Sequence, residues 1–331
     1  MRLLFVGDVM LGRLVNQVLQ REGPAYPWGS ALHIIRAADW RVCNLECVIS
    51  DLGEPWSVTP KVFHFRSDAK NIAVLQAAAL DAVSLANNHV LDYEYEAFVQ
   101  MLRILNGSGI VHAGAGLTAV EAARCAVSTV GGLRVGMMAF TDNEPGWEAT
   151  PVMPGVLYVP IDHHDKRADA LFSAIRLAKL QVDLLVVSAH WGPNWGRRPL
   201  SEQVDFGHAL IDVGADIVFG HSCHVFQGIE WYRDRLILYS TGDFIDDYAV
   251  DEVERNDESF IFVVETEQAE LKKVRLYPTL IEGCQATLAG YHDATRIAEE
   301  METLCRELGT PTQWIERERC LEVGSVYSKI A

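Results

Sequence analysis

Short apolar runs alternate with amphipathic segments along the first third of the chain. The apolar runs at 3–6, 42–45 and 82–86 have the length of buried strands. Residues 11–21, 68–79 and 93–106 have the periodicity of helices, and the last of these stops at a glycine. Parallel strands need a helical crossover between them, so this alternation predicts a parallel sheet.

The pattern changes after residue 124. Two apolar runs joined by Gly131 and Gly132 predict a β-hairpin over residues 125–140. Helix and strand then alternate again, and the runs beyond residue 228 have the spacing of antiparallel strands. The predicted fold class is therefore α/β, with mixed strands in two packed sheets. The later predicted elements are helices at 166–179, 202–213 and 292–308, and strands at 184–189, 217–219, 229–232, 236–240, 260–265 and 271–277.

The chain carries no Gly/Ser-rich or Pro-rich linker, internal repeat or low-complexity segment. At 331 residues it has the length of one large domain or two smaller ones. Without a linker to divide it, we predict one domain over residues 1–285, followed by a helical appendage at 286–331.

Polar residues that can bind a metal stand where several apolar runs end. The most informative segment is GHSCHVFQG at 220–228, which places His221 and His224 three residues apart after a short strand. Ligands at the carboxyl ends of parallel strands converge on one edge of a sheet. The same position after other runs is taken by Asp8, Glu46, Asn88 with His89, and His190.

Each of these residues also has a simpler interpretation. Asp8 could cap the helix that follows it, and Glu46 could end a strand that reaches solvent. Asn88 and His89 could form an ordinary Asn-rich turn, and His190 could be a surface or core histidine. The functional interpretation rests on their shared position: it makes Asn88 a metal ligand and lets His89, with Asp92 nearby, face the substrate as a general acid.

Composition and charge narrow the functional classes. The chain has 28 basic and 45 acidic residues, a formal net charge of -17. That balance argues against a nucleic-acid partner and against binding to anionic lipid, but it allows a local cationic pocket for an anionic substrate. The seven cysteines include no CxxC pair and do not predict a disulfide framework. The chain shows no signal peptide or membrane span, which predicts a cytoplasmic location.

The acidic run from Asp243 to Glu258 is predicted to be an exposed loop, and Asp246 and Asp247 are predicted to be solvated. Asp243 is the exception, because it follows an apolar run and could orient a ligand histidine. The chain has no GxSxG, no P-loop and no GxGxxG after a strand. A mixed set of carboxylate, amide and imidazole ligands favours one or two divalent ions of Mn, Fe, Zn or Co. Such ions activate water for hydrolysis at phosphorus or at a carbonyl carbon.

Six segments together resemble the CapA family of poly-γ-glutamate capsule synthesis proteins, which is similar in turn to calcineurin-like metallophosphoesterases. They occur in the family's order and span residues 1 to about 265. The segments are GDVMLGR at 7–13, NLECVIS at 44–50, SLANNHVLDY at 84–93, SAHWG at 188–192, GADIVFGHSCHVFQG at 214–228 and LYSTGDF at 238–244.

The resemblance implies a four-layer α/β/β/α sandwich with the site at the strand ends. It implies the metal set Asp8, Glu46, Asn88, His190, His221 and His224, with His89 as the acid-donating histidine. Metallophosphoesterases usually carry a histidine two residues after the first aspartate, where this chain has Met10. This departure leaves open whether one ion or two bind.

Two hypotheses follow. The first is a metal-dependent hydrolase of a phosphoester or of a γ-glutamyl or other amide bond, whose substrate is an anionic small molecule or a glutamyl polymer. The second is a non-catalytic accessory protein that uses the same pocket to bind an anionic polymer or a partner enzyme. The sequence does not predict an oligomeric state.

Overall fold

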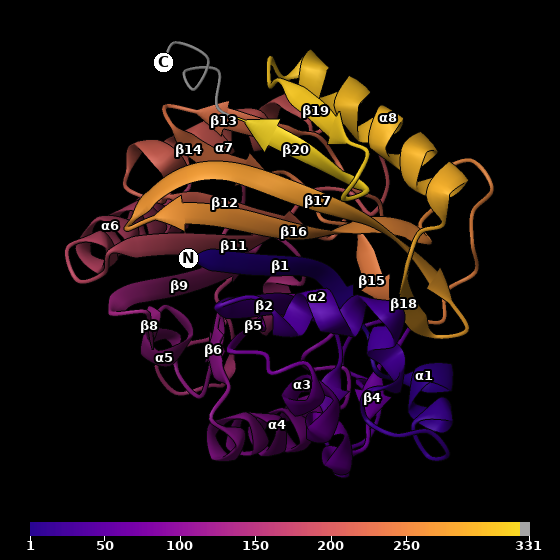
Figure 1. Ribbon diagram of the computed structural model, residues 1–331. Coiled ribbons are helices and arrows are strands. Elements are labelled where there is room, and N and C mark those ends of the chain that lie inside the picture. Colours follow the sequence, from indigo (N-terminus) through magenta and orange to yellow (C-terminus); the bar gives the residue numbers. More distant parts are fainter. Residues whose placement is uncertain (325–331) are drawn as a thin grey trace.

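The computed structural model describes residues 1–324, and most of its strands lie in two sheets (Figure 1). The larger sheet has ten strands, in the order β19-β20-β17-β16-β1-β2-β5-β6, with β15 beside β1 and β18 beside β17. Its strands are β1 (Arg2–Val9), β2 (Trp40–Leu45), β5 (Ala82–Ser84), β6 (Val111–Ala113), β15 (Asp243–Ile245), β16 (Glu258–Glu267), β17 (Glu270–Glu282), β18 (Gln285–Leu288), β19 (Thr312–Ile315) and β20 (Cys320–Gly324).

The smaller sheet has six strands in the order β13-β14-β12-β11-β9-β8. Its four central strands are parallel, and antiparallel partners flank them on both sides. The predicted hairpin is confirmed as the β8–β9 pair. The strands are β8 (Ala126–Val130), β9 (Leu133–Thr141), β11 (Leu184–His190), β12 (Ile217–His221), β13 (Ile229–Tyr232) and β14 (Arg235–Leu238).

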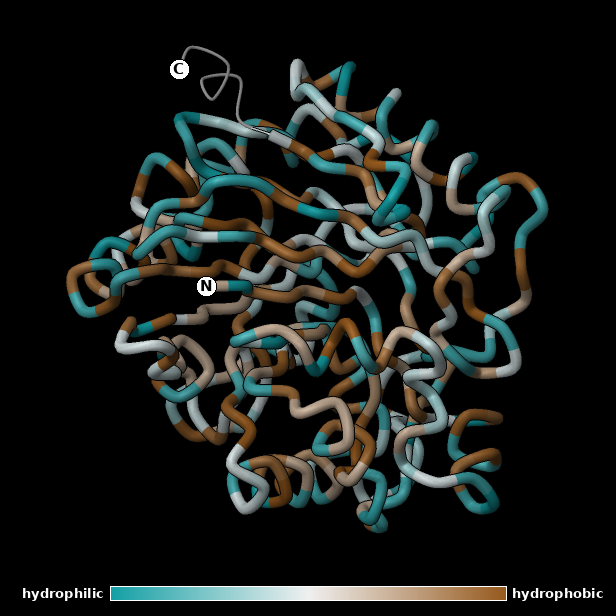
Figure 2. The backbone as a smooth tube through the Cα atoms, in the orientation of Figure 1, coloured by the Kyte–Doolittle hydropathy of each residue, from teal (hydrophilic) through white to brown (hydrophobic). Residues whose placement is uncertain are grey.

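The two sheets face each other across an apolar core. Phe5 of β1 packs in this core with Phe219 of β12, and their ring centroids are 5.3 Å apart. The opposite face of the larger sheet is covered by α1 to α4, and the opposite face of the smaller sheet by α6 and α7. The predicted four-layer α/β/β/α sandwich is therefore confirmed. In Figure 2 the hydrophobic colour follows the inner strands, while the outer loops are more hydrophilic.

The helices connect the strands much as the periodicity predicted. The 166–179 prediction coincides with α6. α1 is shorter than the predicted 11–21, and the predicted 68–79 helix is divided between a 3-10 turn at 69–71 and α3. The helices are α1 (Arg13–Val18), α2 (Leu32–Arg36), α3 (Ile72–Ala77), α4 (Glu94–Ser108), α5 (Ala119–Ala122), α6 (Lys166–Lys179), α7 (Ser201–Asp212) and α8 (Tyr291–Glu307). Short elements are the 3-10 turns η1 (Tyr26–Ala31), η2 (Ala69–Asn71) and η3 (Pro145–Trp147) and the strands β3 (Val48–Ile49), β4 (Arg66–Ser67), β7 (Ala115–Gly116) and β10 (Gly155–Val156).

The C-terminal part of the described chain contains α8 and two strands. β20 pairs with β17 and thereby extends the larger sheet. Ile297 and Met301 of α8 are fully buried in the core between the sheets. The division between residues 285 and 286 stays a prediction, and residues 325–331 lie outside the described part of the chain. Among residues 1–324 there is no helix with both the length and the hydrophobicity needed to span a bilayer.

The parallel strands of both sheets end on one side of the sandwich, where the chain is packed very closely. A side chain at Gly7 would meet the carbonyl oxygen of Gly242 at 1.8 Å, and one at Gly220 would meet that of Tyr239 at 2.0 Å. The glycine before Asp8 therefore allows close approach of the chain's own backbone. These contacts bring β1, β12 and β15 together at the strand ends.

Candidate metal centre

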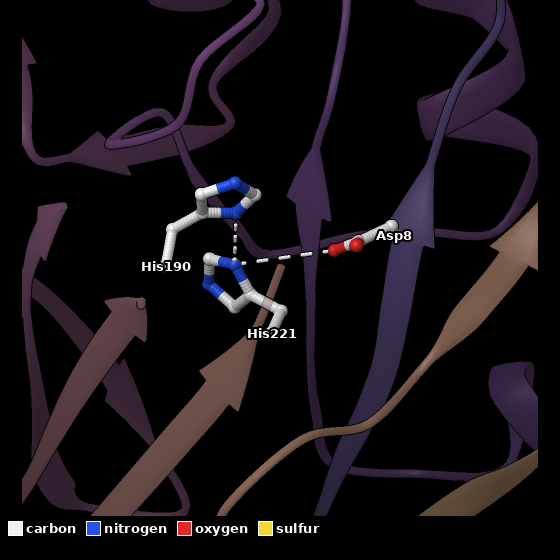
Figure 3. A group of neighbouring side chains, drawn as sticks. All are labelled: Asp8, His190 and His221. Atoms are coloured by element: carbon white, nitrogen blue, oxygen red, sulfur yellow. Dashed lines mark hydrogen bonds and ion pairs between the residues drawn. The ribbon is translucent and has the colours of Figure 1, made fainter. Parts of the chain in front are cut away.

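Two histidines meet at the ends of neighbouring parallel strands. The register pairs His190 of β11 with His221 of β12, and their Nδ1 atoms are 2.8 Å apart. Figure 3 shows Asp8 approaching the same point from β1, with its Oδ1 3.9 Å from His221 Nδ1. The hydroxyl of Ser188 lies 2.7 Å from His221 Nε2. Three side chains from two sheets thus share one buried location.

Both histidines are at most 1% exposed. Burial lowers the pKa of His221 to about 3, and burial together with the adjacent His221 holds the pKa of His190 well below its usual value. The imidazoles are therefore neutral at pH 7. A neutral imidazole offers a lone pair to a metal ion.

A second group lies beside the first and shares Asp8 with it. Ligand atoms of Asp8, Glu46, His224 and Asp243 all lie within 4.8 Å of one another, as do those of Asp8, His190 and His221. Asp243 faces Asp8 in the register of β15 and β1, and its Oδ1 is 2.9 Å from His224 Nδ1. The prediction that Asp243 orients a ligand histidine agrees with this contact.

Buried acceptor atoms without hydrogen-bond partners face this group. The side chain of Asn44 donates to Asp8 Oδ1 at 2.8 Å. Within residues 1–324, however, no donor reaches Asp8 Oδ2, Glu46 Oε2, Asp243 Oδ2 or Asn88 Oδ1. Several unpaired buried oxygens at one place are costly unless a cation neutralises them. The donor set therefore fits a divalent metal ion.

The burial and closeness of these groups shift the pKa values of Asp8, Glu46 and His224. Burial, and then the charge of Asp243, raises the pKa of Asp8 to about 7. Burial and the charge of Asp8 raise the pKa of Glu46 well above its usual value. Burial alone would lower the pKa of His224, but Asp243 and Asp8 outweigh it and raise that pKa to about 9. A bound cation would favour the ionised carboxylates.

His89 and Asp92 form a pair next to the carboxylates. His89 Nδ1 is 2.6 Å from Asp92 Oδ2, which also accepts the backbone N–H of Phe65 at 2.7 Å. The Phe65 ring stacks on the imidazole with a centroid distance of 4.1 Å. The other ring nitrogen, Nε2, is 4.0 Å from Glu46 Oε1. Asp92 thus holds Nδ1 and turns Nε2 toward the centre.

A cavity of about 420 Å³ opens over this centre. Asn88, His89 and His224 line it, whereas Asp8, Glu46, His190 and His221 are at most 1% exposed and lie beneath. This volume is in the range of small-ligand pockets. The other side chains in its wall include Arg13, Lys61, Phe63, Phe65, Trp195 and Tyr248.

Several simpler interpretations of the sequence are wrong. Asp8 does not cap α1, whose N-cap is Gly12. Glu46 does not reach solvent, since it is 1% exposed. Asp246 at 4% and the side chain of Asp247 at 1% are also buried, so the prediction that both are solvated is wrong. The acidic run is consequently not an exposed loop throughout: Asp243, Asp246 and Glu258 are buried, and only its middle, around Asp251, reaches the surface. The backbone of β15 pairs with β1, which pulls the start of this run into the interior.

The sequence did not single out Arg13, Lys61 or Tyr248 as residues of the cavity. Arg13 is the first residue of α1, Lys61 lies in an irregular loop, and Tyr248 follows β15. Their positions depend on contacts between distant segments, and periodicity does not report such contacts. Arg13 alone had a usable signal, because it ends the GDVMLGR segment.

Comparison with known proteins assigns this chain to a family. Residues 2–248 match the family described as bacterial capsule synthesis protein PGA_cap. A relative from Mycobacterium tuberculosis, named a probable polyglutamine synthesis accessory protein, is 31% identical over 92% of this chain and 91% of its own length. The capsule biosynthesis protein CapA of Bacillus anthracis is 29% identical over 73% of this chain and 59% of its own length.

Among solved structures, one described as a novel phosphatase from Mycoplasma pneumoniae is similar with a TM-score of 0.45. It is 10% identical, and the match covers 86% of this chain and 90% of that one. The resemblance to capsule synthesis proteins inferred from the six segments is confirmed by the family match, which covers all six of them fully. The chain therefore belongs to the bacterial capsule synthesis protein PGA_cap family.

Proposed function

We propose that the chain is a metal-dependent hydrolase that cleaves a phosphoester or a γ-glutamyl amide bond and acts in poly-γ-glutamate metabolism. The observation that carries this proposal is the group of unpaired buried oxygens of Asp8, Glu46 and Asn88 beneath a cavity lined by His89. The names of the relatives, which refer to polyglutamine synthesis and capsule biosynthesis, support the glutamyl substrate class.

In this proposal Asp8, Glu46, Asn88, His190, His221 and His224 hold one or two divalent ions of Mn, Fe, Zn or Co. The bound metal would supply an activated water and a positive charge for the developing oxyanion. Asp243 positions His224 through the 2.9 Å contact between them. Asp8 belongs to both ligand groups, so it would contribute a carboxylate to an ion held by either group.

His89 is the proposed proton donor to the leaving group. Asp92 accepts from Nδ1–H and stabilises the imidazolium form, in which Nε2 also carries a proton and faces the substrate. Phe65, stacked on the ring, keeps water from that face. A proton on Nε2 can then be given to a departing alkoxide or amine.

The second candidate is an accessory protein that binds an acidic polymer without cleaving it. The word "accessory" in the name of the Mycobacterium relative favours this alternative. Both candidates use the same cavity, but only the hydrolase needs His89 as a donor.

The deciding experiment combines elemental analysis with a turnover screen. The purified protein, supplied in turn with Mn, Fe, Zn and Co, is assayed on phosphoesters and on γ-glutamyl peptides. We expect bound metal and turnover of one class that chelation abolishes. Metal binding without turnover of either class would replace the hydrolase with the binding protein, and the absence of bound metal would overturn both the centre and the hydrolase.

A further inference from the structure

Two basic side chains, Arg13 and Lys61, are in the wall of the cavity, and they differ in their contacts with the rest of the protein. The ammonium of Lys61 donates to the backbone oxygen of Asn88 at 2.7 Å and to Glu144 Oε1 at 3.2 Å. It also lies 3.4 Å from Asp92 Oδ1, and its side chain is only 8% exposed. Two hydrogen bonds and the ion pair with Asp92 thus hold the Lys61 ammonium against the interior of the protein.

Arg13 has the opposite arrangement. Its Nε is 3.3 Å from Asp247 Oδ1, and its side chain is 39% exposed. Within residues 1–324, neither Nη1 nor Nη2 donates a hydrogen bond. The two terminal nitrogens are the part of a guanidinium that binds two oxygens at once, so the free end of Arg13 can take an oxyanion from the cavity.

The guanidinium is also held in place before any ligand arrives. Its central carbon lies 6.0, 5.8 and 5.9 Å from the ring centroids of Phe63, Phe65 and Tyr248. Asp247 accepts the backbone N–H of Leu14 at 2.8 Å with its second oxygen. A cation fixed by aromatic rings and a buried carboxylate loses little conformational entropy on binding.

The surroundings select the kind of anion. The net charge of -17 repels an acidic chain from most of the surface, so attraction must come from a local cation. Aromatic side chains beside that cation offer contact to methylene groups. A γ-linked glutamyl chain matches both features, because each unit carries one carboxylate and two methylene groups between its amide bonds.

We infer that Arg13 is a specificity-determining residue that binds a carboxylate next to the scissile bond, so that acidic glutamyl chains are preferred over neutral ones. This inference rests on the proposed function, since it assumes that the scissile bond lies over the centre faced by Asn88 and His224. Arg13 holds the flanking carboxylate, while the bond to be cleaved lies beside His89 and His224 in the same cavity.

The test is a binding measurement on the metal-loaded protein that does not depend on turnover. Calorimetry compares a γ-linked hexaglutamate with the same oligomer whose α-carboxylates are carboxamides, and with inorganic phosphate. Arg13→Gln should weaken binding of the acidic oligomer at least about 10-fold, as expected for the loss of a charge-assisted pair. It should also remove the preference over the carboxamide oligomer.

Two further variants separate recognition from folding. Arg13→Lys keeps the charge but not the two-pronged donor, and should bind with intermediate affinity. Arg306→Gln removes an arginine of α8 whose side chain is 69% exposed, and should bind like the wild type. All variants are checked for unchanged thermal unfolding.

The inference is overturned if Arg13→Gln binds the acidic oligomer within 2-fold of the wild type. It is overturned equally if the wild type binds both oligomers alike or neither, or if only phosphate binding depends on Arg13. Glutamate release, recorded in the same samples, reports separately on the hydrolase. Arg13-dependent binding without any release of glutamate would contradict the proposed hydrolysis of glutamyl chains but would still support the inference about Arg13.

Discussion

The two sheets contribute opposite kinds of ligand to the centre. The smaller sheet supplies His190 and His221, whose pKa values are lowered by burial. The larger sheet supplies Asp8, Glu46 and Asp243, whose pKa values are raised by burial. Without a metal ion, burial thus favours the neutral form both of the histidine half (His190 and His221) and of the carboxylate half (Asp8, Glu46 and Asp243). A divalent cation at their junction satisfies both halves, because it binds the neutral imidazoles and stabilises the ionised carboxylates.

His224 differs from the other two histidines and shows how neighbouring charges determine the direction of a pKa shift. It is an imidazole set among carboxylates, and its pKa rises to about 9 where that of His221 falls to about 3. The same side chain therefore responds in opposite directions at two places in one centre. Burial lowers both pKa values, and the acidic neighbours of His224, Asp243 above all, reverse the direction there.

The largest effect on turnover is expected at His89, the proposed proton donor, whose Nε2 lies next to the carboxylate of Glu46. His89→Gln keeps a hydrogen-bonding side chain but cannot donate a proton, so we expect turnover to fall on the order of 100-fold or more. The substrate affinity should change little. Steady-state kinetics on whichever substrate the screen identifies measures both, and wild-type rates in the variant would remove the acid role.

A smaller effect is expected at Asp243. Asp243→Asn removes one buried charge and weakens the hold on His224, so metal affinity should fall about 10- to 100-fold. Without metal the same change should stabilise the fold, because one fewer carboxylate is left desolvated. Competition with a chelator and thermal unfolding with and without metal give the two readouts. Changes of the same sign in both would show that Asp243 has no electrostatic role.

The smallest effect is the pH dependence of the metal-free protein, in which the two halves oppose each other. The folded pKa of Asp8 is about 7 against a usual 3.8, so its contribution to stability is present at low pH and is lost as the pH rises through 7. The folded pKa of His221 is about 3 against a usual 6.5, so its contribution is complete above 6.5 and is lost as the pH falls toward 3.

Single substitutions should separate these slopes. Between pH 5 and 6.5, Asp8→Asn should gain about 1–2 kcal/mol in stability relative to the wild type as the pH rises. His221→Gln should lose a similar amount relative to the wild type over the same range. Urea unfolding of the metal-free proteins at several pH values measures both trends. An offset that stays constant with pH in either variant would contradict the assigned pKa direction.

Local pattern predicted the elements well because their signals are local. The extent of α6 and the β8–β9 hairpin followed from periodicity and from the Gly131-Gly132 turn. The strand-end positions of Asp8, His190 and His221 followed from the rule that parallel strands end together. Their nearness in space was a prediction from that rule, and the distances in the structure agree with it.

What the sequence could not predict depends on contacts between distant segments. Asp246 was expected in solvent, and it is buried because β15 pairs with β1 more than 200 residues earlier in the chain. Lys61 and Arg13 look alike in the sequence as isolated cations. Only the structure shows that Lys61 donates to the interior, whereas Arg13 is paired through Nε and keeps its terminal nitrogens for a ligand. Such differences arise from tertiary packing, which the order of residues does not report.

The central claim is that the histidine half and the carboxylate half hold metal together, and metal content tests it most directly. Elemental analysis would compare the wild type with a variant carrying His221→Ala and His224→Ala, which removes one imidazole from each half, after both are loaded with Mn, Fe, Zn or Co and desalted. We expect one or two equivalents in the wild type and none in the variant, with both proteins folded by circular dichroism. Equal metal content in the two proteins would contradict the account.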